Sequence, residues 1–401
     1  MELDSSNTKI AVFGGGRWAR VLLGILISST KPGIKFSVHT NLEEDMQEWI
    51  DKRNLRERIF VTNNEPDFNR YQYMAAVVAN SSNSHKKSAE IAIAAKIPVL
   101  VEKPMTPSLI DTYELVEIAK KNKTLLSSSL VFLHASYIDN FINKLGSIDT
   151  IKKVYFNWTD TFSESRHGEI KSYDSATPIF KDVLPHMLSI LSKILKNNSF
   201  ELIGCNVSCG GSCVHIVILI SNIECCLKLE RNSDKRRREI FIKGHKNFEL
   251  DFSTEPGIIK ADGQTYCGDI NWSSSPSPLE KMISEFLSDI KLDKFNQESN
   301  INLALSISKL IDQVEPLYLK SLDKWFIEYL NQKEVNNKDI HYFLSELVIG
   351  TLKVSYDKRE ALIIRYLRII SSGQFLYDYQ NSNTELVNNS ISKFISSLKI
   401  N

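Results

Sequence analysis

The amino-acid sequence predicts a doubly wound α/β Rossmann-type domain, then an α+β domain with a large, mostly antiparallel sheet, and finally an α-helical extension. Strand-like and helix-like segments alternate up to about residue 128, which is typical of parallel βαβ units. After residue 150 strand-like segments follow one another, which favours an antiparallel sheet. From residue 321 apolar residues recur at helical spacing. The expected boundaries are therefore 1–128, 129–320 and 321–401.

Apolar runs bounded by turn residues give the individual elements. Strands of the first domain are expected at 9–13, 35–39, 58–61, 74–79, 97–102 and 124–128, with helices between them, notably at about 17–27, 84–95 and 108–121. Strands of the second domain are expected at 151–161, 200–208, 214–220, 223–230, 238–243 and 247–251, and amphipathic helices at 181–195, 278–290 and 302–319.

A glycine-rich segment follows the first strand. The residues from Gly14 to Ala19 read G-x-G-x-x-A, the pattern of dinucleotide-binding turns. The first glycine permits the tight turn, Gly16 lets the backbone approach a pyrophosphate, and Ala19 allows close packing of helix on strand. A glycine-rich turn without a ligand is the alternative, but the position directly after the first strand favours a nucleotide site with phosphate on the helix amides.

The end of the second strand bears on the choice of cofactor. Sites that prefer NAD usually carry an acid there, about 20 residues beyond the glycines. This sequence has Thr40 and Asn41 instead, which slightly favours NADP over NAD. Glu43 or Glu44 remains as an alternative acid, and no arginine stands at this tip to bind a phosphate.

Two further stretches carry residues suited to chemistry. The apolar run from 97 ends in Glu102, Lys103 and Pro104, and ligands of open α/β sheets bind just past the carboxyl ends of strands. Asp182 and His186 stand four residues apart, on one face of the expected helix, and an imidazole titrates in the range needed for proton transfer. A hydrogen-bonded Asp–His pair without catalytic function is the alternative reading of the second stretch.

Three stretches together resemble a known family: the glycine-rich turn, residues 80–85 leading into Glu102-Lys103-Pro104, and residues 182–186. They are similar to the Gfo/Idh/MocA oxidoreductases, which include glucose-fructose oxidoreductase and inositol dehydrogenase. The likeness covers residues 9 to about 318. Departures at residues 176–180, where many relatives carry paired glycines, and at Met187, where many carry an acid, concern the substrate more than the reaction.

The resemblance implies hydride transfer between NADP or NAD and a secondary alcohol or ketone, on a sugar or nucleotide sugar. It implies that Lys103 contacts the reacting hydroxyl and the cofactor ribose, that His186 is the acid-base residue, and that Asp182 orients the substrate or the imidazole. The cofactor-binding residues that follow are Gly14, Gly16, Arg17, Trp18, Thr40, Asn41, Asn80, Ser81, His85, Glu102 and Lys103.

Substrate contacts are expected from the segment before the Asp182–His186 helix. Arg166 is either a ligand for a substrate carboxylate or phosphate or an ordinary surface arginine, and Tyr173 either stacks on a sugar or packs in the protein. Two other functions stay open: a thiazolinyl-type imine reductase of the same superfamily, and a nonenzymatic scaffold or sensor that binds a protein partner through residues 321–401.

Composition excludes several classes of protein. With 49 basic and 48 acidic residues the net charge is +1, so no nucleic-acid partner is expected, and the basic run 235–238 is read as a solvated turn or strand end, or as a site for a phosphorylated substrate.

The absence of long apolar runs and the polar N-terminus predict a cytoplasmic protein with no membrane contact. The six cysteines are expected to be free thiols, and Cys205, Cys209, Cys213 and His215 to lie on strands flanking a turn, with no metal site. The resemblance also implies a homo-oligomer.

Overall fold

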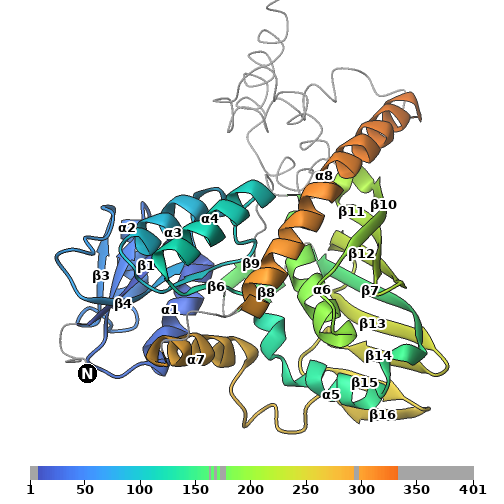
Figure 1. Cartoon of the computed structure of the whole chain (residues 1–401), viewed down its shortest axis with the longest axis horizontal. Helices are drawn as coiled ribbons and strands as arrows, with labels where there is room; N and C mark the ends of the chain where they lie inside the picture. Colours follow the sequence, from blue (N-terminus) through green and yellow to red (C-terminus); the bar gives the residue numbers. More distant parts are fainter. Residues whose placement is uncertain (1–7, 162–163, 167–168, 172–177, 293–297, 333–401) are drawn as a thin grey trace, which may run out of the picture. The chain divides into compact units, whose positions relative to one another are not determined.

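The computed structural model describes residues 8–161, 164–166, 169–171, 178–292 and 298–332 (Figure 1). Contacts divide the chain into two compact units. Unit 1 comprises Met1–Gly146, Leu184–Ser199 and Cys267–Asp312, and unit 2 comprises Ser147–Val183, Phe200–Tyr266 and Gln313–Asn401. The chain therefore leaves unit 1 and returns to it twice. Tyr173 and most of the predicted C-terminal extension lie outside the described residues.

Unit 1 is built on a parallel sheet of six strands in the order β3-β2-β1-β4-β5-β6. The strand order reverses between β1 and β4, which is the doubly wound arrangement that the sequence predicts. The strands are β1 (Lys9–Phe13), β2 (Lys35–His39), β3 (Ile59–Thr62), β4 (Tyr73–Val78), β5 (Val99–Val101) and β6 (Leu126–Ser128). The helices between them are α1 (Arg17–Ser29), α2 (Glu43–Asp51), α3 (His85–Ala94) and α4 (Leu109–Asn122).

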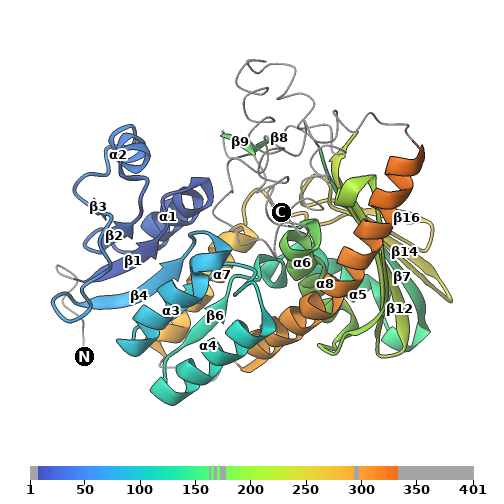
Figure 2. The same ribbon diagram turned by 90° about the horizontal axis from the view of Figure 1, so that it is seen from above.

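Both faces of this sheet are buried, which explains why its strands are continuous apolar runs. In β1, Ile10 and Val12 belong to one core cluster with residues of α1 and α7 (Pro278–Lys291). Ala11 and Phe13 belong to a second cluster with residues of α3 and α4. The views in Figures 1 and 2 show helices on either side of the strands.

Late segments of the chain complete unit 1. Helix α7 begins with a capping box formed by Ser277 and Glu280 and packs beside α1. The first part of α8 (Glu298–Gln332) is attached by the side chain of Asn300, which accepts from the Ser128 amide at 3.0 Å, and by a 2.9 Å bond between Ser308 and Thr112. Helix α5 (Ser136–Leu145) also belongs to this unit. None of the helices among the described residues is long and apolar enough to cross a membrane.

Unit 2 is built on an eight-stranded sheet in the order β10-β11-β12-β7-β13-β14-β15-β16. Strands β12 and β7 pair in parallel, and the other registered pairs are antiparallel, as the sequence predicts. The bounds are β7 (Ile151–Thr161), β10 (Glu201–Ser208), β11 (Cys213–Ile220), β12 (Ile223–Ser233), β13 (Arg237–Gly244), β14 (Asn247–Asp251), β15 (Ile258–Ala261) and β16 (Gln264–Cys267). Strands β15 and β16 escaped the sequence prediction, and a small hairpin, β8 (Glu164–Arg166) with β9 (Glu169–Lys171), follows β7.

Two helices pass from one unit to the other. Helix α6 (Ile179–Leu195) carries the predicted Asp182–His186 pair and starts slightly before the expected residue 181. Helix α8 is longer than the expected 302–319 and continues to Gln332. In unit 2 it is attached to β10 by a 2.9 Å bond from the Val207 amide to the Ser321 hydroxyl. The helical prediction for residues 321–401 is therefore confirmed as far as Gln332.

Candidate active site

The glycine-rich turn crosses the carboxyl ends of three strands, and Gly14 is required there for a steric reason. Its φ is +119°, and a Cβ atom at this position would lie 2.7 Å from the Ala79 carbonyl oxygen and 2.8 Å from the Asn80 nitrogen. The Gly14 amide donates to the His39 carbonyl at 2.9 Å. The turn is thus fixed between the ends of β2 and β4, at the position where the strand order reverses.

Gly16 has a different function, because a Cβ atom there would meet nothing within 4 Å. It is the N-cap residue of α1, without a side-chain cap and with no acidic residue in the first turn. The first amides of a helix and its dipole attract anions. Nη1 of Arg17 is buried and has no hydrogen-bond partner in the structure. This open, electropositive helix start fits a dinucleotide pyrophosphate.

The end of β2 lies beside the same turn. A Cβ atom at Gly15 would lie 2.5 Å from Oγ1 of Thr40, so Thr40 packs directly on the glycine-rich backbone. The Thr40 hydroxyl accepts from the Leu42 amide at 3.0 Å, and Asn41 is exposed. Helix α2 then opens with three acids in its first turn, Glu43, Glu44 and Asp45. The uncharged tip is therefore followed within a few residues by a negative patch.

The loop after β4 is held by His85, which is only 2% exposed. Its Nε2 lies 3.1 Å from the Asn80 carbonyl and its Nδ1 lies 2.9 Å from the Pro104 carbonyl. Burial lowers the pKa of His85, although the two carbonyl contacts act in the opposite direction. His85 thus joins the loop after β4 to the loop that carries Lys103, a structural contact that the sequence did not indicate.

Asn80 and Ser81 lie on that loop. The Asn80 side chain donates to the Ser88 hydroxyl at 2.8 Å, while its Oδ1 is buried and has no hydrogen-bond partner in the structure. An unsatisfied buried acceptor beside the glycine-rich turn is a candidate contact for a ligand donor. The Ser81 hydroxyl lies 3.2 Å from that of Ser84.

Glu102 and Lys103 follow the end of β5, as predicted, and the Lys103–Pro104 peptide bond is cis. The Glu102 side chain is 5% exposed, accepts from the Ser129 hydroxyl, and accepts from the Lys103 amide at 3.2 Å. Burial raises the pKa of Glu102, against the opposing effects of Ser129, Trp18 and Lys103. Glu102 therefore links β5, β6 and α1, and a contact of its carboxylate with a cofactor ribose stays a prediction.

Asp182 and His186 lie one turn apart on α6. In unit 2 the Asp182 carboxylate accepts from Nη2 of Arg231 on β12 at 3.4 Å. In unit 1 the Phe132 ring and the His186 imidazole form a T-shaped contact, with ring centroids 5.1 Å apart. Lys103 and His186 both belong to unit 1, together with the glycine-rich turn. The sequence did not indicate Arg231, whose position at a strand end is unremarkable without the fold.

The predicted substrate residues have different outcomes. Arg166 ends strand β8, but its side chain is outside the described part of the chain, as is all of Tyr173. The basic run is the turn from β12 into β13, and acids pair with its arginines: Arg236 with Glu164 at 2.7 Å, Arg237 with Asp234 at 3.7 Å, and Arg238 with Asp160. These pairs favour a structural reading of the run over a phosphate site.

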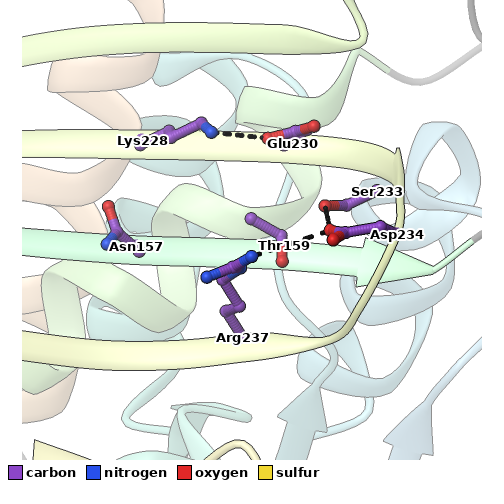
Figure 3. A pocket seen from close by; sticks show the side chains of 7 residues that line it. All are labelled: Asn157, Thr159, Lys228, Glu230, Ser233, Asp234 and Arg237. Atoms are coloured by element: carbon purple, nitrogen blue, oxygen red, sulfur yellow. Dashed lines mark hydrogen bonds and ion pairs between the residues drawn. The ribbon is translucent and has the colours of Figure 1, made fainter.

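A hollow of about 270 Å³ on the unit 2 sheet is lined by residues of β7, β12, β13 and the turn between β12 and β13, and Arg237 of the basic run is one of them (Figure 3). Its charged groups pair with one another: Lys228 with Glu230 at 2.7 Å, and Asp234 with both Ser233 at 3.1 Å and Arg237. Because these pairs compensate the charges locally, the lining of the hollow shows no charged group that needs a ligand.

On β10 and β11, Cys205 and Cys213 are free thiols, and burial raises the pKa of Cys205 to about 12.

Comparison with known proteins identifies the Rossmann part of the chain. Residues 9–129 match the family described as "Oxidoreductase family, NAD-binding Rossmann fold", which is the Gfo/Idh/MocA family. No curated protein sequence is similar enough to count as a relative.

Solved structures share the fold at low sequence identity. KijD10, a 3-ketoreductase from Actinomadura kijaniata in complex with TDP-benzene and NADP, superposes with a TM-score of 0.62 at 14% identity, over 76% of this chain and 96% of that one. UDP-N-acetylglucosamine 3-dehydrogenase GnnA from Acidithiobacillus ferrooxidans gives 0.60 at 16%, over 76% and 96%. A Gfo/Idh/MocA family oxidoreductase from Vibrio cholerae gives 0.59 at 16%, over 77% and 98%.

Proposed function

Because residues 9–129 form an NAD-binding Rossmann domain of the Gfo/Idh/MocA oxidoreductase family, we propose that this protein transfers hydride between a nicotinamide cofactor and a secondary alcohol or ketone of a sugar or nucleotide sugar. The observation that carries the proposal is the open N-terminus of α1 at Gly16, with a buried, unpartnered Nη1 on Arg17. Phosphate oxygens would accept from these amides and from the guanidinium.

In this proposal the residues of the chain divide the work around the reacting carbon. The nicotinamide supplies or accepts the hydride. Lys103 is the electrophile, since an ammonium group beside the reacting oxygen stabilises the negative charge that develops on it. His186 accepts the hydroxyl proton during oxidation and returns it during reduction. Asp182, one turn earlier on α6, stabilises the imidazolium form by its charge.

The sugar class is supported by two structural neighbours whose names include a 3-ketoreductase and a UDP-N-acetylglucosamine 3-dehydrogenase. Nucleotide sugars and their 3-keto forms are therefore the first substrates to try. Arg166 and Tyr173, which precede α6, are proposed substrate contacts, with Arg166 binding an anionic group.

The first test is a titration of NADH and NADPH into the purified protein, followed by nicotinamide fluorescence, with the wild type and Gly16→Asp. An aspartate at an N-cap position favours the helix, so the variant should melt no lower than the wild type. Its carboxylate would occupy the phosphate site and repel the pyrophosphate, so binding should be lost.

Saturable binding to the wild type alone leads to a turnover screen, in which Lys103→Ala is expected to bind the cofactor and to lose most of its kcat. If the folded wild type binds neither dinucleotide, the oxidoreductase proposal is wrong, and the nonenzymatic scaffold becomes the better hypothesis.

A further inference from the structure

Arg231 is a charged residue at a position where the strand pattern calls for an apolar one. In β12 the buried residues alternate with partly exposed ones: Cys225, Leu227 and Leu229 are buried, and Arg231 continues the same phase at 5% exposure. Burying a guanidinium is unfavourable unless a charged partner and hydrogen bonds compensate it. The amide of Arg231, which donates to the Ser212 carbonyl at 2.8 Å, fixes the strand at this point.

A charged partner is Asp182 of α6, whose carboxylate accepts from Nη2 of Arg231 at 3.4 Å. The two side chains differ in burial, with Arg231 at 5% and Asp182 at 39% exposure. The Arg231 side chain is thus held within the protein, whereas the Asp182 carboxylate is partly exposed to solvent. The neighbouring Lys181 pairs with Glu315 of α8 at 2.7 Å, so two ion pairs hold the first turn of α6.

A second core-face arginine provides the contrast. Arg238, on β13, is 1% exposed, pairs with Asp160 of β7, donates to the Thr159 carbonyl at 2.7 Å and stacks 3.8 Å over the Trp158 ring. These contacts join neighbouring strands of one sheet. The contact of Arg231 instead joins the sheet to the helix that carries His186.

We propose that Arg231 is a positioning residue that fixes the Asp182 carboxylate on α6 and thereby sets the charge felt by His186 one turn later. Its importance for turnover rests on the proposed function. The electrostatic link from Arg231 through Asp182 to His186 does not, so it is measured in the protein without cofactor or substrate.

The experiment follows the titration of the His186 imidazole by NMR in the full chain with 13C-labelled histidine, its signal assigned with His186→Asn. Arg231→Gln removes a positive charge and leaves the Asp182 carboxylate uncompensated. The pKa of His186 should then rise by about half a pH unit, because the uncompensated carboxylate one helical turn away favours the imidazolium form. Arg231→Lys keeps the charge and should restore most of the wild-type value.

Two further variants separate this link from a general structural effect. Asp182→Asn removes the negative charge and should shift the pKa of His186 downward, opposite to Arg231→Gln. Arg238→Gln, an equally buried arginine of the same sheet, should leave it within about 0.2 unit, since its partner is Asp160. Other ion pairs are unchanged in all variants: on the same helix Lys181 with Glu315 and Lys193 with Asp139, each at 2.7 Å, and, two residues beyond the Phe132 that contacts His186, His134 with Glu285 at 3.3 Å.

The outcome decides the proposal either way. Equal shifts in Arg231→Gln and Arg238→Gln, shifts of the same sign in Arg231→Gln and Asp182→Asn, or no shift in Arg231→Gln would overturn it. Arg231→Gln is expected to fold, because water can solvate the half-exposed Asp182. If it does not, Arg231→Met, which removes the same charge and places an apolar side chain in the buried site, carries the same comparison. Failure of the protein to bind dinucleotides would overturn the proposed function and leave this result unaffected.

Discussion

Gly14 and Gly16 are two residues apart, and the structure predicts opposite consequences for adding one methyl group to each. In Gly14→Ala the backbone would keep a φ of +119°, and the new Cβ would lie 2.7 Å from a carbonyl oxygen. A side chain in such a conformation costs about 1–3 kcal/mol, and the backbone contact adds to this, so we expect a loss of roughly 2–4 kcal/mol in the free energy of unfolding. For a unit of about 200 residues this lowers Tm by roughly 5–15 °C.

In Gly16→Ala the methyl group meets open space at a φ of −70°. Losing glycine at an N-cap costs a few tenths of a kcal/mol, and the stiffer unfolded chain offsets part of that, so Tm should change by less than about 2 °C. The methyl group would stand where the pyrophosphate approaches the backbone. We therefore expect NADH or NADPH affinity to fall by about tenfold or more, which is about 1.4 kcal/mol.

The assay is a pair of measurements on each variant: thermal unfolding without cofactor, and nicotinamide fluorescence titration. Gly24→Ala is the matched control, since Gly24 is exposed within the same helix and a Cβ there also meets nothing within 4 Å. It should stabilise α1 by up to about 1 kcal/mol and leave binding unchanged. Unchanged binding in a folded Gly16→Ala, or a Gly14→Ala protein as stable as the wild type, would refute the steric reasoning.

Two further predictions concern charges around the same turn. Burial raises the pKa of Glu102, so its ionised form is disfavoured in the folded state, and stability should decline as pH rises from the ordinary carboxyl pKa of about 4.3 through the raised one. The Tm of Glu102→Gln should therefore equal that of the wild type near pH 4 and exceed it by a growing margin toward pH 8. If the wild type instead has the higher Tm at pH 8, Ser129 and Lys103 stabilise the carboxylate more than burial opposes it. Replacing Glu43, Glu44 and Asp45 by Gln, Gln and Asn should raise the affinity for NADPH relative to that for NADH by several-fold at low salt, because carboxylates repel a 2′-phosphate. An unchanged ratio of the two Kd values would show that the 2′-position does not lie near these acids.

Local sequence was sufficient for much of this fold, for a physical reason. The strands of unit 1 are buried on both faces and read as continuous apolar runs, whereas in the strands of unit 2 buried residues alternate with more exposed ones. Both patterns can be recognised within a single segment of the sequence. A helix between the second and third strands was expected, but the bounds of α2 were not predicted, because its first turn is acidic and only Met46, Trp49 and Ile50 are buried. The return of residues 184–199 and 267–312 to unit 1 depends on tertiary packing, which no local period encodes.

The residues of the candidate site also fall into two groups, those found from local sequence and those found only from the fold. The glycines, Lys103 and the Asp182–His186 pair could be proposed from the sequence because each belongs to a short motif in the chain. The supporting contacts join residues far apart: His85 bridges two loops, Glu102 reaches Ser129, and Arg231 reaches back 49 positions to Asp182. Such partners are chosen by the fold, and single-sequence reasoning has no access to them.

The arginines near the turn from β12 to β13 show where sequence reasoning on charge goes astray. A run of basic residues normally indicates a solvated face. Strand alternation turns Arg238, the last residue of the basic run, toward the buried side of the sheet, and it does the same for Arg231, which lies on β12 before that run. Each of the two is compensated by an acid from another element, Asp160 for Arg238 and Asp182 for Arg231. A basic residue at the start or end of a strand should therefore be read by its position: one in the apolar phase is a candidate for a buried ion pair. The element that supplies the acid then decides what the pair joins: Asp160 of β7 joins Arg238 to a neighbouring strand, and Asp182 of α6 joins Arg231 to a helix.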